Sequence, residues 1–482
     1  MIVRTLSAPA HRMRAAGCCL SLALALPGIL GGCSGVPRRA AAAASVPATG
    51  PVGYRVPVEY YRLRNGLRVV LSPERSVPTV TVATHYHIGW RLEPEGRTGF
   101  AHLFEHLMFQ ESTNLAKGEA NQIIQGNGGV GNGQTHYDYT NYYEIVPSHA
   151  LEPVLWVEAE RLRGLAVGAE SLKNQQEVVK NEVRVNVLNR PYGGFGWLDV
   201  PQYANANWHN AHNFYGDLAD IDAATLDDVR AFYDTYYTPR NAVLVVAGDF
   251  DTAQAKAWIE QYFGPLADRP EPSRPDVSEP AQTEEKRATR TDPLAPRPAL
   301  ALAYHVPARN SRDWYAFSLL SAVLLDGEES RLWRRLVREK GYSDSVSGGI
   351  NYGGSLFDYD GPTLWTVTLL HDASTADADI VREFDRVVAD LAQQPVTAEE
   401  RQRASTRLRS SFYDLAGDSR RVGLVTLLAS FALFDDDPGR VNRIETEFGR
   451  ITAADLERVA REYLVPTNRT VLRLVPGAEG GR

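Results

Sequence analysis

Cysteine is nearly absent from this chain, and the position of the few cysteines limits the chemistry of the folded protein. The 482 residues contain only Cys18, Cys19 and Cys33, all close to the N-terminus. The rest of the chain therefore has no thiol that can form a disulfide or bind a metal ion. Any metal site in the folded part must use histidine and carboxylate ligands.

The sequence also lacks a long basic run and an apolar segment long enough to span a membrane. The formal net charge is −8, which argues against nucleic acid as the main partner. The apolar stretch of residues 18–30 is shorter than the roughly 20 residues that a spanning helix needs. It follows Arg4, Arg12 and Arg14, and this order is typical of a secretion signal.

The end of this apolar stretch indicates a lipid anchor. Residues 30–33 (LGGC) resemble the lipobox of bacterial lipoproteins, in which the chain is cut before the cysteine and the thiol is acylated. We therefore expect a signal peptide over residues 1–32, lipid on Cys33 and a tether over residues 33–55. A plain secretion signal that ends near a cysteine is the alternative. The anchor would be the only contact with a bacterial membrane, on its periplasmic side, and Ser34 favours the outer membrane.

The length of the chain favours two domains over a single core. A hydrophobic fraction of 44% and a charged fraction of 23% are typical of a soluble globular protein. Between residues 268 and 298, Pro, Glu, Arg, Ser and Thr dominate and large apolar residues nearly vanish. This composition indicates a linker, with one domain over residues 56–267 and the other over residues 299–477.

Hydrophobic periodicity predicts helices and strands in both halves. In the first half the predicted strands are residues 69–71, 79–88, 134–146 and 242–247, and the predicted helices are residues 98–109, 151–165, 171–188 and 225–237. A glycine-rich loop is expected at residues 126–133. In the second half, strands at 299–305, 364–370 and 470–475 and helices at 314–325 and 330–340 follow in similar order. The repeat, about 220 residues later, predicts a duplicated α+β unit, and two unrelated α+β domains are the alternative.

His102, Glu105 and His106 form the strongest chemical motif. On the predicted helix, positions i and i+4 lie on one face about one turn apart, so both imidazoles can reach one metal ion. Glu105 precedes the second histidine and can reach a water on the metal without being a ligand itself. His-x-x-Glu-His is the reverse of the commoner zinc-peptidase order and is the signature of inverted zinc peptidases. An amphipathic helix with two histidines at the edge of the core is the alternative.

A catalytic zinc site needs a third protein ligand and an open position. Glu177 and Glu182 lie on the predicted helix of residues 171–188, five residues apart, and point in different directions. Their spacing does not choose between them. His85 and His87 lie on a predicted strand, where histidines are usually structural, and we do not count them as ligands.

Several segments resemble the pitrilysin, insulysin and mitochondrial processing peptidase family. They are residues 96–110 (GRTGFAHLFEHLMFQ), 140–144 (TNYYE), 178–183 (VVKNEV), 191–193 (PYG) and 236–249 (YYTPRNAVLVVAGD). The resemblance covers nearly all of residues 58–475, in order, and is closest to the shorter two-domain bacterial members. It implies an α+β fold of two homologous, duplicated α/β sandwich domains arranged as a clamshell.

The resemblance also implies the metal and its third ligand. In the family the metal is Zn²⁺, and the third ligand is a glutamate about 75 residues beyond the second histidine, which matches Glu182. The implied ligands are therefore His102, His106 and Glu182, with Glu105 as the catalytic base. The family often has a further acidic residue where this chain has Gln175, so the support around the site is expected to differ.

A substrate strand is implied as well. In the family an edge strand beside the zinc pairs with extended peptide, and residues 128–135 match it. Gly129 lets another backbone come close, and Val130 and Asn132 are the expected contacts with the peptide. A flexible glycine-rich turn without a ligand is the alternative.

The second half departs from the family pattern. Active single-chain relatives carry an Arg and a Tyr that reach the substrate carbonyl, and this chain has Val337 and Asp344 at those positions. Losing one such donor can cost about 10²–10³ in rate. Arg338 and Tyr342 lie nearby, but in a different register. Because some bacterial relatives divide zinc and the Arg/Tyr pair between two chains, we expect a related subunit as partner.

The expected function is that of a zinc-dependent endopeptidase that hydrolyses unfolded or short peptides, as the zinc-bearing subunit of a heterodimer. The alternative is a catalytically weak peptide-binding or assembly subunit, which the missing Arg/Tyr pair favours and the complete zinc motif disfavours. A structural lipoprotein without metal accounts only for the signal and the tether.

Overall fold

The computed structural model of the protein describes residues 55–477. The predicted signal peptide of residues 1–32, the lipid site Cys33 and all of the predicted tether except Arg55 lie outside the described residues. Within residues 55–477, no helix combines the length and the apolar character that crossing a membrane requires.

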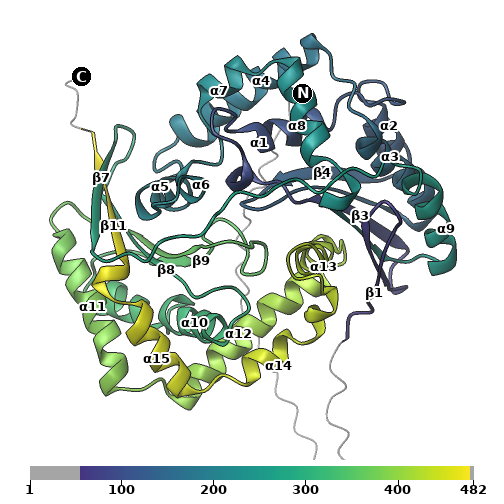
Figure 1. Cartoon of the computed structure of the whole chain (residues 1–482). Helices are drawn as coiled ribbons and strands as arrows, with labels where there is room; N and C mark the ends of the chain where they lie inside the picture. Colours follow the sequence, from purple (N-terminus) through teal and green to yellow (C-terminus); the bar gives the residue numbers. More distant parts are fainter. Residues whose placement is uncertain (1–54, 478–482) are drawn as a thin grey trace, which may run out of the picture. The chain divides into compact units, whose positions relative to one another are not determined.

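A six-stranded sheet is the framework of the first half, with the order β1-β2-β6-β3-β5-β4 (Figure 1). The strands are β1 (Glu59–Arg62), β2 (Arg68–Pro73), β3 (Thr79–Tyr86), β4 (Val130–Thr135), β5 (Thr140–Pro147) and β6 (Ala242–Gly248). Strands β2 and β6 are parallel, and all other neighbours are antiparallel. Every residue of β6 is buried, which agrees with its uninterrupted apolar sequence and its place inside the sheet.

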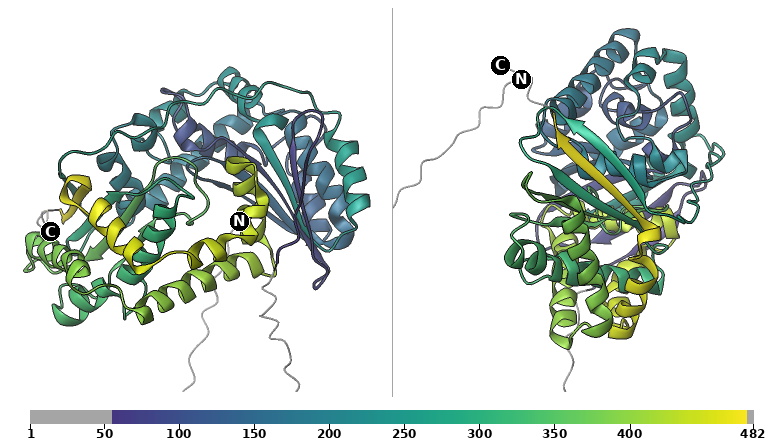
Figure 2. Two further views of the ribbon diagram at one scale, coloured as in Figure 1. Left: turned by 60° about the horizontal axis from the view of Figure 1, so that its bottom comes forward. Right: turned by 90° about the vertical axis from the view of Figure 1, so that its left-hand side faces the viewer.

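The second half contains a five-stranded sheet with the order β7-β11-β8-β10-β9. Its strands are β7 (Lys286–Asp292), β8 (Ala299–His305), β9 (Ser347–Ile350), β10 (Leu364–Leu370) and β11 (Arg469–Pro476). Strands β7 and β11 are parallel and lie side by side in the right-hand view of Figure 2, and the other neighbours are antiparallel. This is the order and direction of β2-β6-β3-β5-β4, and each strand follows its counterpart by roughly 220 residues. The prediction of a duplicated α+β unit is confirmed.

Helices cover both sheets. In the first half they are η1 (Trp90–Leu92), α1 (Phe100–Leu107), α2 (Glu119–Gly126), η2 (Ser148–Ala150), α3 (Leu151–Arg163), α4 (Ala169–Val183), η3 (Arg184–Leu188), η4 (Phe195–Asp199), α5 (Val200–Ala204), α6 (Trp208–Ala211), α7 (Leu218–Ala223), α8 (Leu226–Tyr236), η5 (Pro239–Asn241) and α9 (Thr252–Phe263). In the second half they are α10 (Arg312–Leu325), η6 (Trp333–Glu339), α11 (Asp377–Gln393), α12 (Ala398–Gly417), α13 (Val422–Asp435), η7 (Pro438–Asn442), α14 (Ile444–Gly449), α15 (Ala453–Tyr463) and η8 (Pro466–Asn468). The predicted helices at residues 98–109, 151–165, 225–237 and 314–325 correspond to α1, α3, α8 and α10, with ends shifted by a few residues.

Helix α13 joins the cores of the two halves. Its sequence is apolar around the whole circumference, which is typical of a helix that is buried on all sides. It packs against β3 and β6 of the first sheet, and its leucines belong to the core that Trp314 and Trp365 build in the second half. The two halves therefore share hydrophobic contacts as well as sequence connectivity.

The segment of residues 268–298, predicted to be a linker, contains a strand in its second part. Strand β7 lies there and pairs in parallel with β11, as β2 pairs with β6 in the first half. Apart from Ala288 the strand consists of polar residues, and up to Thr291 they alternate between half-buried and exposed positions, because β7 is the edge of its sheet. Without large apolar residues it gives no hydrophobic signal, and it forms because β11 supplies a partner backbone.

The glycine-rich segment is also more ordered than its composition predicts. Strand β4 begins at Val130, inside the expected loop of residues 126–133, and the strand expected at residues 134–146 is divided by a turn into β4 and β5. Glycines weaken a strand when they are judged by propensity alone. Here Gly129 is required, because a Cβ atom would lie 2.4 Å from Val146 Cγ1 on the neighbouring strand.

Candidate metal centre

Helix α1 presents two histidines on one face. Phe100, Leu103, Phe104 and Leu107 bury the opposite side of this helix in the core of the first half. His102 and His106 lie one turn apart, and their Nε2 atoms are 3.4 Å from each other. The arrangement agrees with the i, i+4 spacing in the sequence.

Helix α4 brings Glu182 to the two histidines. Its Oε2 atom lies 3.6 Å from His102 Nε2 and 3.4 Å from His106 Nε2. Glu177, the other candidate on this helix, points to the surface, where its carboxylate pairs with Lys180 at 2.7 Å. The structure therefore brings Glu182 to the histidine pair and keeps Glu177 away from it, a choice that the spacing left open.

The three side chains fit a zinc ion. Ligand atoms about 2.0–2.1 Å from a tetrahedral zinc ion lie about 3.3–3.4 Å from one another, close to the three distances in this cluster. Two imidazoles and one carboxylate are also a donor set that zinc prefers. In the described part of the chain, this is the one group of at least three His, Cys, Asp or Glu side chains with such convergent atoms.

The electrostatics of the cluster suit a cation. Burial lowers the pKa of His102 to about 4, and the neighbouring His106 acts in the same direction, so the His102 ring is neutral and its Nε2 lone pair is free to bind. The hydrogen bond with His106 lowers the pKa of Glu182, which keeps this carboxylate ionised. The His102 side chain is 3% exposed and that of Glu182 is 32% exposed. The cluster is thus closed toward the core and accessible from solvent, as a catalytic site requires.

Glu105 belongs to α1, the helix that carries His102 and His106, and its side chain contacts strand β4. Thr135 at the end of β4 donates a hydrogen bond of 2.8 Å from Oγ1 to Glu105 Oε2. Burial raises the pKa of Glu105, and the hydrogen bond from Thr135 opposes this rise. Gly133 leaves room for the side chain, since a Cβ atom there would lie 3.1 Å from Glu105 Cγ. A half-buried carboxylate with a raised pKa is suited to accept and return a proton.

Two residues that sequence reasoning missed contact Glu182. Tyr215 donates from its hydroxyl to Glu182 Oε1 at 3.4 Å, and Asn186 donates from Nδ2 to the same oxygen at 3.4 Å. Asn186 lies one turn after Glu182, so its helical spacing was a usable signal, whereas nothing local points to Tyr215. Gln175 is buried two turns before Glu182, and Glu177 does not replace the acidic residue expected there, because it pairs with Lys180.

The predicted substrate segment lies on an open edge. Strand β4 is the last strand of its sheet and pairs only with β5. Val130 is 60% exposed, and Asn132 is exposed opposite Tyr143 of β5. The backbone groups on the outer side of β4 are therefore available to another extended chain, as in β-strand addition. Gly129 precedes the strand.

Val337 and Asp344, at the positions where the resemblance predicts an Arg and a Tyr, contact other residues of the second half. Val337 lies in η6 and packs against the core of that half, and Asp344 pairs with Arg297 at 2.9 Å. Arg338 lies 3.9 Å from Glu329, and Tyr342 packs on the same core as Val337. Neither Val337 nor Asp344 therefore offers a side-chain hydrogen-bond donor to a substrate carbonyl.

The strand histidines are structural, as predicted. His85 and His87 are buried on β3 or directly after it, and neither belongs to the metal-facing cluster. His85 lies against the ring of Tyr139 with a centroid distance of 5.0 Å. Burial lowers the pKa of both histidines, so both are neutral members of the core.

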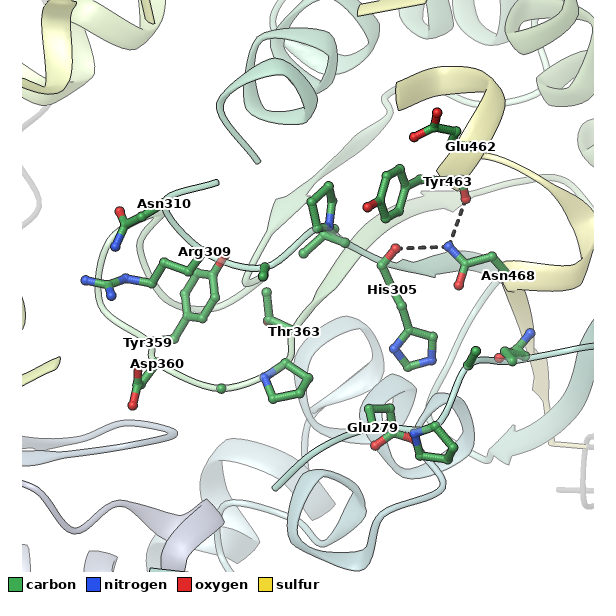
Figure 3. Close-up of a pocket in the computed structure, with 18 of the residues that line it drawn as sticks. Glu279, His305, Arg309, Asn310, Tyr359, Asp360, Thr363, Glu462, Tyr463 and Asn468 are labelled. Atoms are coloured by element: carbon green, nitrogen blue, oxygen red, sulfur yellow. Dashed lines mark hydrogen bonds between the residues drawn. The ribbon is translucent and has the colours of Figure 1, made fainter. Parts of the chain in front are cut away.

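A separate cavity of about 710 Å³ lies in the second half (Figure 3). Its polar groups largely satisfy one another: Asn468 Nδ2 donates to the carbonyl oxygens of His305 and Tyr463, and Arg309 binds both carboxylate oxygens of Asp435 at 2.9 Å. None of the residues of the metal-facing cluster lines this cavity. Its lining gives no convergent donor set for a metal ion.

Comparison with protein families gives two matches along the chain. Residues 68–191 match the model described as "Insulinase (Peptidase family M16)", and residues 223–408 match the one described as "Peptidase M16 inactive domain". His102, Glu105, His106 and Glu182 all fall within the first match. The second match begins after the last of them.

Similar proteins include several named as zinc proteases. "Zinc protease PqqE" of Helicobacter pylori is 27% identical over 423 residues, which cover 87% of this chain and 93% of that protein. An uncharacterized zinc protease of Mycobacterium leprae is 25% identical over 364 residues, covering 72% of this chain and 76% of that protein.

Solved structures agree with this fold. The crystal structure of a protease from Helicobacter pylori matches with a TM-score of 0.79 and 26% identity, covering 88% of this chain and 100% of that one. A peptidase M16 inactive domain from Pseudomonas fluorescens matches with a TM-score of 0.76 and 18% identity, covering 88% of this chain and 98% of that one. The periplasmic protease PqqL from Escherichia coli matches with a TM-score of 0.70 and 18% identity, and the match covers 87% of this chain and 48% of PqqL.

Proposed function

This chain belongs to peptidase family M16, and on that premise we propose that it is a zinc-dependent endopeptidase acting on unfolded or short peptides. The observation that carries the proposal is the convergence of His102, His106 and Glu182 within 4.8 Å, beside the raised-pKa carboxylate of Glu105. Relatives that carry the name zinc protease support the metal and the reaction.

The mechanism follows from the placement of the side chains. His102, His106 and Glu182 would hold zinc, which when bound would supply a Lewis acid for the scissile carbonyl and make a nearby water more acidic. Glu105 accepts the proton of the attacking water and returns it to the leaving amine. Thr135 holds one oxygen of Glu105, so the carboxylate is oriented before the substrate arrives.

Strand β4 determines the class of substrate in this proposal. A peptide that adds to the edge of β4 must be extended, so a folded protein does not fit until it exposes a free segment. Asn132 and the backbone between Gly129 and Thr135 are the groups that would bind the peptide backbone. Because these contacts are to backbone, they favour extended conformation over one particular side chain.

A related subunit is the proposed partner. Val337 and Asp344 leave the chain without the Arg/Tyr pair that the resemblance predicts, and a second M16 chain would supply it. Support comes from PqqL. The match covers 48% of that chain, so a single PqqL chain is long enough for two units of the size of this protein. We further propose acylation at Cys33 and a periplasmic location; the support is the signal-like N-terminus, and PqqL is described as periplasmic.

The second candidate is a peptide-binding or assembly subunit with little turnover. The match of residues 223–408 to a domain described as inactive, together with Val337, Asp344 and Gln175, favours it. In that case the chain would bind zinc and extended peptide without cleaving the peptide at a useful rate.

The two candidates differ in one experiment. A fluorogenic unstructured peptide is incubated with the full chain and one equivalent of zinc, alone and with the product of a neighbouring related gene. We expect cleavage that Glu105→Gln lowers by at least about 10²-fold while zinc remains bound. Zinc binding without Glu105-dependent cleavage in either mixture supports the binding subunit, and full activity of the chain alone contradicts the need for a partner.

A further inference from the structure

Helix α1 begins without a cap of its own. Its first residue is preceded by Gly99, which has a φ of 78° and no side chain to accept from the free N–H groups of the first turn. Glycine is required there, because a Cβ atom would lie 2.4 Å from the carbonyl oxygen of Tyr215. The N–H groups at the start of the metal-facing helix therefore need an acceptor from elsewhere in the chain.

Glu93 supplies this acceptor. Its Oε2 atom accepts from Gly99 N at 2.8 Å and its Oε1 atom from Ala101 N at 2.6 Å. The residue is fully buried. A carboxylate at a helix N-terminus also interacts favourably with the helix dipole, and more strongly when it is buried.

The buried carboxylate has a partner in His212. Glu93 Oε2 lies 3.5 Å from His212 Nε2, and the two ring nitrogens also face the carbonyl oxygens of Trp90 at 2.6 Å and Trp208 at 3.1 Å. Both ring nitrogens therefore face acceptors, and these contacts fix the orientation of the ring. The ring also stacks on Trp208 at a centroid distance of 4.2 Å, which fixes its orientation further.

The orientation of His102 depends on this first turn. Metal-bound histidines usually fix their ring by donating the second nitrogen to a carboxylate or carbonyl. His102 Nδ1 is buried and has no protein partner among residues 55–477. Its ring is held by packing against Phe214 and Tyr215, at centroid distances of 4.8 and 5.2 Å, and by its backbone next to Ala101. The orientation of the His102 ring is therefore set by the position of its backbone, whereas at other metal sites a hydrogen bond to the ring sets it.

We propose that Glu93 and His212 are a positioning pair for the metal centre. Glu93 fixes Gly99 and Ala101, and through them the direction in which His102 presents Nε2 to the metal. His212 holds the Glu93 side chain in place through the contact between His212 Nε2 and Glu93 Oε2. Neither residue is a ligand or touches the substrate. The inference rests on the proposed zinc function and adds to it a determinant of metal affinity outside the ligand set.

Zinc affinity of the full chain, measured by competition with a chromogenic chelator, tests the pair. Glu93→Gln keeps the size of the side chain but turns an amide group toward one N–H donor, and we expect about tenfold weaker zinc binding. His212→Gln should weaken binding in the same direction, and the double variant should lose less than the product of the two single losses. Turnover at saturating zinc is measured alongside, so that metal loss and misplacement of the bound metal are separated.

Asp455→Asn is the matched control. Asp455 is also a carboxylate at a helix N-terminus, where it accepts from Thr452 N at 2.9 Å at the start of α15 in the second half. The Asp455→Asn substitution should lower the thermal stability and leave the zinc affinity within about twofold, because Asp455 has no contact with the helix that carries His102 and His106.

The results distinguish a failure of the Glu93–His212 pair from a failure of the zinc function. Glu93→Gln with a lower Tm but unchanged zinc affinity and turnover would make Glu93 a structural cap only and overturn the pair. If Glu93→Gln does not fold, His212→Gln decides the question alone, and unchanged affinity in that variant overturns the pair as well. Wild-type protein that binds no more zinc than His102→Ala refutes the zinc function itself.

Discussion

Replacing Thr135 by valine tests whether strand β4 holds Glu105, the proposed catalytic base. Valine has nearly the shape of threonine without the hydroxyl, so the substitution removes the 2.8 Å hydrogen bond to Glu105 and the 3.4 Å contact of the same hydroxyl with the Ala101 carbonyl oxygen. A hydrogen bond to a charged group contributes about 1.5–3 kcal/mol. Since 1.36 kcal/mol corresponds to about tenfold in rate, we expect kcat/KM to fall by roughly tenfold or more at neutral pH.

The pH dependence should change in a defined direction. Burial raises the pKa of Glu105, and the Thr135 hydroxyl lowers it by stabilising the ionised form. Without the hydroxyl this pKa rises further, and because a general base acts only when it is ionised, the acid limb of the kcat/KM profile moves to higher pH. The loss of rate is therefore largest in acid and smallest at alkaline pH.

Thr135→Ser is the control, because serine keeps the hydroxyl. Both variants and the wild type are assayed with the same fluorogenic peptide across the pH range, at saturating zinc and with the partner chain present. Serine should keep the acid limb and most of the rate. If valine and serine give the same rate and the same acid limb, Thr135 does not orient Glu105 and the reasoning about strand β4 is wrong.

Three further outcomes follow from the same geometry. Glu182→Gln should weaken zinc binding by at least about tenfold in a chelator competition, whereas Glu177→Gln, at the surface, should bind as the wild type does. Gly133→Ala should lower kcat/KM without loss of zinc, because its Cβ would lie 3.1 Å from Glu105 Cγ, and Gly126→Ala, with no atom within 4 Å, should not. Zinc at about 100 times its Kd should stabilise the fold by roughly 2.7 kcal/mol, seen as a Tm that falls on chelation.

The local part of the metal centre was predictable, because one helix turn fixes it. His102, Glu105 and His106 are separated by helical spacings, so their common face follows from sequence alone. Glu182 is different: it comes from another helix, and only the resemblance distinguished it from Glu177. Thr135 and Tyr215 contact the site from a strand end and a loop, and no periodic pattern connects them to the motif.

The strands show the same difference between features that local sequence predicts and features that depend on distant segments. Strands such as β6 and β8 were predicted because an apolar run identifies a buried strand without reference to its neighbours. Strands β4 and β7 were missed or shortened, because one is rich in glycine and the other in charge. Both are edge strands whose formation depends on a partner backbone, and propensity does not contain that information.

The contacts of the second half bear on whether this chain cuts peptides alone. Its loop between β9 and β10 reaches the turn after β4, where His136 Nδ1 lies 3.5 Å from Asp358 Oδ2 and Asp360 N donates to Asp138 Oδ2 at 2.7 Å. The first of these contacts holds His136, the residue that follows Thr135, and the second holds the turn after it. They brace the segment that contains Thr135, whereas Val337 and Asp344 carry no cationic or hydroxyl side chain at the positions where the resemblance predicts an Arg and a Tyr. If a partner chain supplies the two missing groups, as proposed, activity should rise on pairing through kcat more than through KM.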